Sequence, residues 1–238
     1  MSYTMEPIGL IHSPFKEKFG LPRQAGLIPE SEADLELLPP YDHEEALRGL
    51  AAFSHLWLIF IFHANPADRW SPTVRPPRLG GNRRLGLFAT RSPFRPNRLG
   101  LSAVKLNGFG RQAGKLLLHL QGADLLDGTP VLDIKPYLPY ADAIPQAAAG
   151  FAPDKPEPPF RVEFSPQAET FCREADPARY PNLGRLIGQV LQSDPRPAYY
   201  TVAAPKDHFY LRLFDLQIVW TVRDETVMVN QIGPAGAE

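Results

Sequence analysis

The amino-acid sequence predicts a mainly β protein with an α+β addition at its C-terminal end, and three observations lead to this fold class. Several short apolar runs are separated by turn signals, which is typical of a small barrel or sandwich. Strand–helix alternation is missing, which argues against a doubly wound, Rossmann-type sheet. The 27 prolines among 238 residues, roughly twice the average usage, break helices and central strands and favour loops.

Most of the strand signals lie before residue 141. The strongest is Phe53–Phe62, which is apolar along most of its length and is therefore expected to be buried on both faces. Asn107-Gly108 is a strong hairpin signal, so the strands on either side of it should be antiparallel neighbours. One short helix is expected at His43–Leu50. The remaining predicted strands are Pro7–Ile11, Asp34–Leu38, Leu85–Ala89, Leu101–Leu106, Lys115–Gln121 and Val131–Leu138.

The composition changes at Ala141–Pro159, which is rich in alanine and proline and is the best candidate for a linker. We therefore expect one domain over residues 1–150 and a small α+β domain over residues 151–238. In the second, Ser165 followed by Pro166 suits the N-cap and first turn of a helix. The elements expected there are helices at Ser165–Glu174 and Leu183–Gln192 and strands at Asp215–Arg223 and Thr226–Ile232.

Several classes of protein are disfavoured by composition. The single Cys172 cannot form an intramolecular disulfide or a cysteine-rich metal site, and the six histidines show no metal-ligand spacing. The start of the chain lacks the features of a signal peptide. The longest apolar run, Leu56–Phe62, is far shorter than the roughly 20 residues of a membrane helix. A cytoplasmic protein with no metal and no membrane partner is the resulting expectation.

Positive charge is concentrated in Arg69–Arg98, which holds eight arginines, no lysine and no acidic residue, although the whole chain has a net charge of −1. Arginine binds phosphate and carboxylate groups in a bidentate way and stacks on bases. Trp70, Phe88 and Phe94 are interleaved with these arginines. Such a segment suits a folded or single-stranded RNA. The alternative is a solvated basic loop that pairs with the acidic remainder of the chain.

Two features of this segment suggest a built site. Arg91-Ser92-Pro93-Phe94-Arg95-Pro96-Asn97-Arg98 is stiffened by two prolines, and a braced loop that presents arginines fits a preorganised site. Gly80-Gly81 either lets the backbone pass close to a ligand or makes a plain turn. We assign Arg91 and Arg95 to a pocket, and Arg75, Arg78, Arg83 and Arg84, which flank the glycine pair, to phosphates.

Two further positions have both a structural and a functional interpretation. His63 ends the apolar strand, just before Ala64, and strand ends commonly carry binding residues, whereas His43 and His55 are interpreted as structural. In Asp124–Pro130 the Asp127-Gly128 step is explained by a turn. Alternatively, the carboxylates or amides of this loop hold the ribose or ammonium group of a small cofactor.

Five motifs together resemble the TrmO (TsaA-like) family, and the resemblance covers nearly the whole chain. One departure is Arg98-Leu99, where family members often have Pro-Ile, which leaves the stiffness of the loop and the role of Arg98 open. The motifs are Phe53–Trp57, Arg91–Asn97 with Gly100–Ser102, Asp124–Pro130, Asp133–Tyr137 and, near the C-terminal end, Asp194–Tyr199.

The resemblance implies an S-adenosylmethionine-dependent tRNA methyltransferase that acts on N6 of threonylcarbamoyladenosine next to the anticodon. It also implies a β-barrel methyltransferase domain without a Rossmann core, a small C-terminal domain and a homodimer. The implied cofactor contacts are Pro22, Arg23, Gln24, His63, Ala64, Arg91, Leu101, Asp124, Leu125, Leu126 and Asp127.

The RNA partner would be the anticodon arm of the tRNA. Its phosphates are expected to meet Arg75, Arg78, Arg83, Arg84, Arg95 and Arg98. The sequence does not identify a catalytic base, for which Asp124, Asp127 and His63 are candidates. A non-catalytic RNA-binding module that uses the same basic loop is the alternative function, and affinity for S-adenosylmethionine distinguishes the two.

Overall fold

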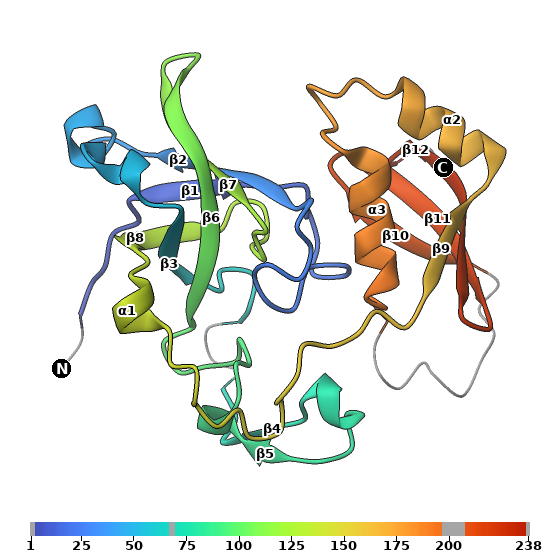
Figure 1. The fold of residues 1–238 in the computed structure, drawn as a ribbon, viewed down its shortest axis with the longest axis horizontal. Coiled ribbons are helices and arrows are strands. Elements are labelled where there is room, and N and C mark those ends of the chain that lie inside the picture. The colour runs from blue at the N-terminus through green and yellow to red at the C-terminus, as the bar shows by residue number, and fades with distance from the viewer. Residues whose placement is uncertain (1–2, 67–69, 197–207, 237–238) are drawn as a thin grey trace.

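A computed structural model describes residues 3–66, 70–196 and 208–236 of the chain. It is mainly β with few helices, as the sequence predicts. A strand-rich N-terminal part, coloured blue to green, is followed by an α+β part coloured orange to red (Figure 1). Of the predicted features, Arg69 and residues 197–199 of the C-terminal motif lie outside the described residues.

Six antiparallel strands of the N-terminal part form a closed barrel, because the last strand pairs back with the first. Their order around the barrel is β1-β2-β7-β6-β3-β8. Alternate side chains point inward, so Ile11, Leu35, Leu56 and Leu118 fill one core. The strands are β1 (Gly9–His12), β2 (Glu32–Leu37), β3 (His55–Ile61), β6 (Leu99–Gln112), β7 (Lys115–Gln121) and β8 (Pro130–Pro136).

The expectation that Phe53–Phe62 is buried on both faces is wrong. In β3, Leu56, Leu58 and Phe60 are buried, whereas Trp57 and Ile59 between them are only partly buried. A barrel strand has a single inner face, so an apolar run places every second side chain on the outside. The outward Trp57 is covered in part by the Tyr137 ring, whose centroid lies 5.6 Å away.

The Asn107-Gly108 pair is not the hairpin turn that its sequence suggests. Strand β6 continues to Gln112, and the turn falls at Ala113-Gly114, where both residues have positive φ angles of 49° and 84°. Asn107-Gly108 instead lies at a shift of register against β7, with Gly108 at φ 147°. A β-bulge uses glycine for the same conformational reason as a turn does. The predicted antiparallel pairing of the two strands is confirmed.

Two other elements are shorter than predicted. The helix expected at His43–Leu50 is a pair of 3₁₀ turns, Glu44–Leu47 and Leu50–Ala52, because Gly49 between them has a positive φ of 87°. The strand expected at Leu85–Ala89 ends at Gly86. It forms β5 (Leu85–Gly86), which pairs with β4 (Thr73–Val74), and a 3₁₀ turn follows at Leu87–Ala89.

The C-terminal part is a sheet with helices packed on it. After α1 (Pro139–Asp142) the chain has no helix or strand until residue 161, which agrees with the predicted linker. Both predicted helices are confirmed, and the Ser165 hydroxyl caps the first by accepting the amide of Ala168. The sheet order is β10-β11-β12-β9. The elements are β9 (Arg161–Phe164), α2 (Pro166–Glu174), α3 (Leu183–Gln192), β10 (Phe209–Leu213), β11 (Leu216–Arg223) and β12 (Thr226–Pro234).

The loop between β1 and β2 joins the two parts. Phe15 and Ile28 belong to this loop, yet both are buried in the core of the C-terminal part. The Phe214 amide donates to the Pro14 carbonyl at 2.7 Å, and Phe15 makes a β-bridge with Leu213. The β1–β2 loop is therefore held by the barrel strands at its two ends and by the C-terminal part in its middle.

A first prediction concerns Gly100 in β6. A Cβ atom there would overlap the ring of Phe60, whose side chain is almost fully buried. Gly100→Ala should therefore lower the free energy of unfolding by about 1–3 kcal/mol through overpacking. Gly110→Ala is the matched control, because it lies in the same strand with nothing near its Cβ position. Urea denaturation measures both variants, and equal losses would show that the Phe60 contact is not the cause.

Candidate functional site

Three loops meet at one end of the barrel. Neighbouring antiparallel strands run in opposite directions, so the segments at 13–31, 62–98 and 122–129 all connect strand ends on the same side. Each of the three carries residues that the sequence marks as candidates. Loops that a rigid sheet positions in this way commonly form binding sites.

Buried serines hold the loop that follows β7. The Ser31 hydroxyl donates to the Ala123 carbonyl at 2.6 Å, and the Ser13 hydroxyl donates to the Leu125 carbonyl at 2.8 Å. Both serines are almost inaccessible to solvent. The two carbonyls belong to the neighbours of Asp124, so the backbone is anchored on each side of this residue.

Asp124 lies against residues from the other two loops. The Arg91 charge, the Ala25 amide and the Ser102 hydroxyl all act on its carboxyl group. Arg91 in turn donates a hydrogen bond to the Gln24 side chain. Gln24, Arg91 and Asp124 are far apart in the sequence, and the fold brings them together.

The carboxyl group of Asp124 is buried in a way that destabilises the protein when no ligand is bound. Its Oδ1 atom is buried without a hydrogen-bond partner among the described residues. Burial raises the pKa of the Asp124 carboxyl above its ordinary value, and this effect outweighs the Ser102, Ala25 and Arg91 contributions, which lower it. A buried acceptor without a partner costs stability, and such groups are common where a ligand completes the site.

A second group of polar residues surrounds the end of β3. Lys18 donates to the Ala64 carbonyl at 2.9 Å and also hydrogen-bonds the Asn65 side chain. Asn65 is buried, and within the described part of the chain its Nδ2 donor has no partner. Loss of solvation lowers the pKa of His63, the Lys18 charge lowers it further, and the Asp127 carboxylate opposes both. His63 nevertheless keeps an exposed surface. It is therefore a neutral, accessible imidazole at neutral pH.

Both parts of the chain match models of one family. The tRNA-methyltransferase O N-terminal domain matches residues 10–143, and the C-terminal domain of the same family matches residues 157–235. The chain belongs to the tRNA-methyltransferase O family.

Relatives from two bacteria support this membership over nearly the full length. The chain is 45% identical to the tRNA (adenine(37)-N6)-methyltransferase of Escherichia coli, covering 98% of this chain and 99% of the relative. It is 51% identical to a putative S-adenosylmethionine-dependent methyltransferase, RcsF, of Pseudomonas aeruginosa, covering 92% and 93%. A crystal structure of TrmO from Pseudomonas aeruginosa is similar with a TM-score of 0.80 and 42% identity, covering 98% and 99%.

The other residues that the family resemblance marks have different surroundings. Pro22 is buried, whereas Arg23 is exposed. Leu101 alternates with the inward Ser102 in β6, so its side chain points out of the barrel and is 57% exposed. Asp127 is occupied structurally, because it accepts the Ser13 amide at 2.9 Å and pairs with Lys16 at 2.7 Å.

Sequence reasoning missed Lys18, Ser102 and the two anchoring serines as parts of this site. Lys18 and Asn65 are 47 residues apart, so no local pattern connects them. In the sequence Ser102 is one of several inward-facing residues that alternate along β6, and nothing distinguishes it from the others. Its position beside Asp124 follows only from the closed barrel.

The arginines of the basic segment divide into anchored and free groups. Arg98 donates to the Asn65 carbonyl at 3.0 Å, and Arg95 donates to the Thr90 carbonyl at 3.0 Å and lies 5.6 Å from the Phe88 ring centroid. These two therefore hold the loops of the site in place. Arg75 and Arg83 are exposed, and no hydrogen bond or ion pair engages their side chains within the described residues. Gly80 and Gly81 have positive φ angles with open space around them, which indicates a turn without a close neighbour.

The described residues hold no group of three His, Cys, Asp or Glu side chains placed to bind a metal ion. None of the helices in the described ranges is long and apolar enough to cross a membrane.

A second prediction uses the buried carboxyl group of Asp124. Its folded-state pKa is raised above 3.8, so the parent protein should lose stability relative to Asp124→Asn as the pH rises through that raised value. Thermal unfolding of the ligand-free proteins from pH 4 to pH 8 measures the difference. At neutral pH the asparagine variant should be as stable as the parent or more so. A variant that becomes less stable relative to the parent at low pH and more stable at high pH supports this account, and the opposite trend contradicts it.

Proposed function

We propose that the protein transfers a methyl group from S-adenosylmethionine to N6 of the modified adenosine next to the anticodon of tRNA. The observation that carries this proposal is the near full-length similarity to a relative named tRNA (adenine(37)-N6)-methyltransferase. Independent support comes from the polar atoms of Asp124 and Asn65 at the end of the barrel, which are unpaired within the described ranges and can hydrogen-bond a cofactor. The modified base, threonylcarbamoyladenosine, follows from the family resemblance.

Two of the three buried polar atoms that lack a partner among the described residues lie in these loops and fit the cofactor, whereas the third, Trp220 Nε1, lies in the C-terminal core. Asp124 offers an acceptor at Oδ1, and Asn65 offers a donor at Nδ2. S-adenosylmethionine carries an ammonium group and ribose hydroxyls that donate hydrogen bonds, and a carboxylate that accepts them. Gln24, Arg91 and the backbone of residues 124–127 stand beside these groups and would hold the remaining edges of the cofactor. His63, Ala64, Pro22, Arg23 and Leu101 complete the proposed cofactor contacts.

The cofactor supplies an electrophilic methyl group on its sulfonium sulfur. The chain supplies positioning, which can account for a large share of the rate of such a displacement. The proton on N6 also has to leave. His63 suits this task better than Asp127, because its lowered pKa leaves a ring nitrogen free to accept a proton. Asp127 is already engaged by the Ser13 amide and Lys16.

The anticodon arm would lie over the basic segment. Arg75, Arg78, Arg83 and Arg84 are exposed, and Trp70 and Phe88 of the same segment are 54% and 76% exposed. Arginines neutralise phosphates, and aromatic rings stack on unpaired bases. Arg95 and Arg98 would contact RNA from the edge of the site.

The remaining features of the proposal concern organisation. Residues 1–150 would form the methyltransferase domain, a barrel without a Rossmann core, and residues 151–238 the C-terminal domain. Two separate hydrophobic cores support this division. A homodimer and a cytoplasmic location are what the resemblance and the composition imply.

A third prediction tests the reaction. With labelled S-adenosylmethionine, the protein should methylate tRNA that carries threonylcarbamoyladenosine and leave an unmodified transcript of the same tRNA unlabelled. Mass analysis of the nucleosides identifies the product. Equal labelling of both RNAs would show that the modification is not recognised. Binding of tRNA without any affinity for S-adenosylmethionine would favour a non-catalytic RNA-binding module.

A fourth prediction separates the roles of the arginines. Replacing Arg83 and Arg84 with alanine should weaken tRNA binding and flatten its dependence on salt, by about 0.7–0.9 in log K per log salt for each phosphate that is no longer neutralised. Affinity for S-adenosylmethionine should not change. Arg91→Ala should instead abolish turnover with a smaller change in the salt dependence, because Arg91 lies beside Asp124.

Affinity measured across a salt series distinguishes the two variants. An unchanged slope in the Arg83/Arg84 variant would mean that these side chains are solvated surface charges. Loss of cofactor affinity in that variant would indicate that Arg83 and Arg84 belong to the cofactor pocket.

A further inference from the structure

The sheet of the C-terminal part has one face covered by helices and one bare face. Helices α2 and α3 pack on the sheet through β9 and β12. The covered face carries Leu211, Trp220 and Val227, all of which are buried in the C-terminal core. Alternate residues of each strand therefore point to the opposite face, which lies away from the helices.

The bare face carries three arginines on three strands: Arg161 on β9, Arg212 on β10 and Arg223 on β11. All three are exposed, and none makes an ion pair with a described residue. By contrast, Arg179, Arg185 and Arg196 elsewhere in the C-terminal part each lie within 4 Å of a carboxylate. The only described acidic side chain on the strands of this face is Glu163. The strands of this face therefore carry three arginines against one carboxylate, so the face has a net positive charge.

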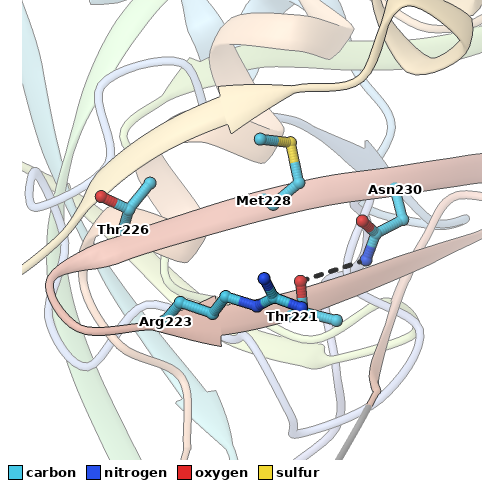
Figure 2. A pocket seen from close by; sticks show the side chains of 5 residues that line it. All are labelled: Thr221, Arg223, Thr226, Met228 and Asn230. Atoms are coloured by element: carbon cyan, nitrogen blue, oxygen red, sulfur yellow. Dashed lines mark hydrogen bonds between the residues drawn. The ribbon is translucent and has the colours of Figure 1, made fainter.

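A hollow of about 310 Å³ lies on this face, at the end of the β11–β12 hairpin. Figure 2 shows its lining: Arg223 extends along β11 toward Thr221, and the Asn230 amide donates to the Thr221 hydroxyl at 3.3 Å. Thr226 and Met228 form the β12 side. A guanidinium beside hydroxyl and amide groups matches the phosphate and ribose groups of RNA.

The bare face also extends toward the proposed cofactor site. Arg212 lines a second hollow, of about 500 Å³, together with Lys16 of the β1–β2 loop and with Arg179, Tyr180, Phe214 and Asp215. The one carboxylate of this hollow, Asp215, is paired with Arg179. Lys16 pairs with Asp127 at 2.7 Å, in the loop that we propose to hold the cofactor. Tyr210, on the same strand as Arg212, is 57% exposed. One continuous bound molecule could therefore touch both the C-terminal sheet and the catalytic end of the barrel.

We propose that the bare face of the sheet β10-β11-β12-β9 is a second RNA-binding surface, which holds the sugar–phosphate backbone of the tRNA through Arg161, Arg212 and Arg223. This inference rests on the proposed function, because it takes tRNA as the substrate. It assigns to the C-terminal part a role that is separate from the arginines of the barrel loops.

The test compares two pairs of substitutions that remove the same charge from the same domain. Arg161→Ala with Arg223→Ala changes the bare face. Arg173→Ala with Arg185→Ala changes α2 and α3 on the other face. Among the described residues Arg173 bonds only Thr170, and Arg185 makes a long, exposed pair with Glu30 at 3.8 Å. Binding of full-length tRNA is measured for the whole protein across a salt series, together with S-adenosylmethionine affinity and turnover at saturating tRNA.

The bare-face pair should weaken tRNA binding about tenfold and flatten the salt slope by about 1.5, as expected when two phosphates are no longer neutralised. Its cofactor affinity and its turnover at saturating tRNA should match the parent, and the helical pair should bind tRNA as the parent does. Parent-like tRNA binding by the bare-face pair overturns the proposal, as does equal weakening in both pairs.

Two further outcomes distinguish an interface between copies of the chain from a failure of the proposed function. If the bare-face pair changes the mass of the protein in solution by light scattering, the face is a contact between copies of the chain, and the proposal fails. If the parent binds tRNA but transfers no methyl group, the proposed function fails, while the comparison of the two pairs still decides the surface.

Discussion

The candidate site depends on two buried hydroxyl groups. Ser31 and Ser13 come from opposite ends of the β1–β2 loop, and their hydroxyls donate to the carbonyls of Ala123 and Leu125, the neighbours of Asp124. A buried carbonyl without a donor would cost about 1–3 kcal/mol, so this arrangement strongly disfavours other positions of the loop. Asp124 is thereby held in a place where its own Oδ1 has no partner among the described residues. The destabilisation at that atom is offset by the anchoring bonds around it.

The same loop connects the site to the C-terminal part. Phe15 lies in the C-terminal core, while its carbonyl accepts the Asp127 amide at 2.9 Å. The next residue, Lys16, pairs with the Asp127 carboxylate. Two adjacent residues, Phe15 and Lys16, therefore join the C-terminal core to the loop proposed for the cofactor. A binding surface on that sheet would be coupled to the site by ordinary packing and hydrogen bonding.

Local patterns predicted the local structure well. Both C-terminal helices and strand β7 are confirmed, because periodicity and the Ser165-Pro166 start are properties of neighbouring residues. The turn predicted at Asn107-Gly108 is wrong, since a bulge and a turn require the same glycine conformation. The bonds of Ser13, Ser31 and Lys18 join residues 46 to 112 positions apart and could not be read from spacing. The family resemblance indicated Gln24, Arg91 and Asp124, but only the fold shows that Arg91 hydrogen-bonds Gln24 and that its charge acts on the Asp124 carboxyl group.

We propose that the three loops at one end of the barrel bind the cofactor between Asp124 and Asn65. The most direct measurement is a crystal structure of the protein with S-adenosylhomocysteine. The account predicts that the ligand lies beside Gln24 and Arg91, with a donor on Asp124 Oδ1 and an acceptor on Asn65 Nδ2. A ligand bound at the other end of the barrel, or one that leaves both of these atoms without partners, would contradict it.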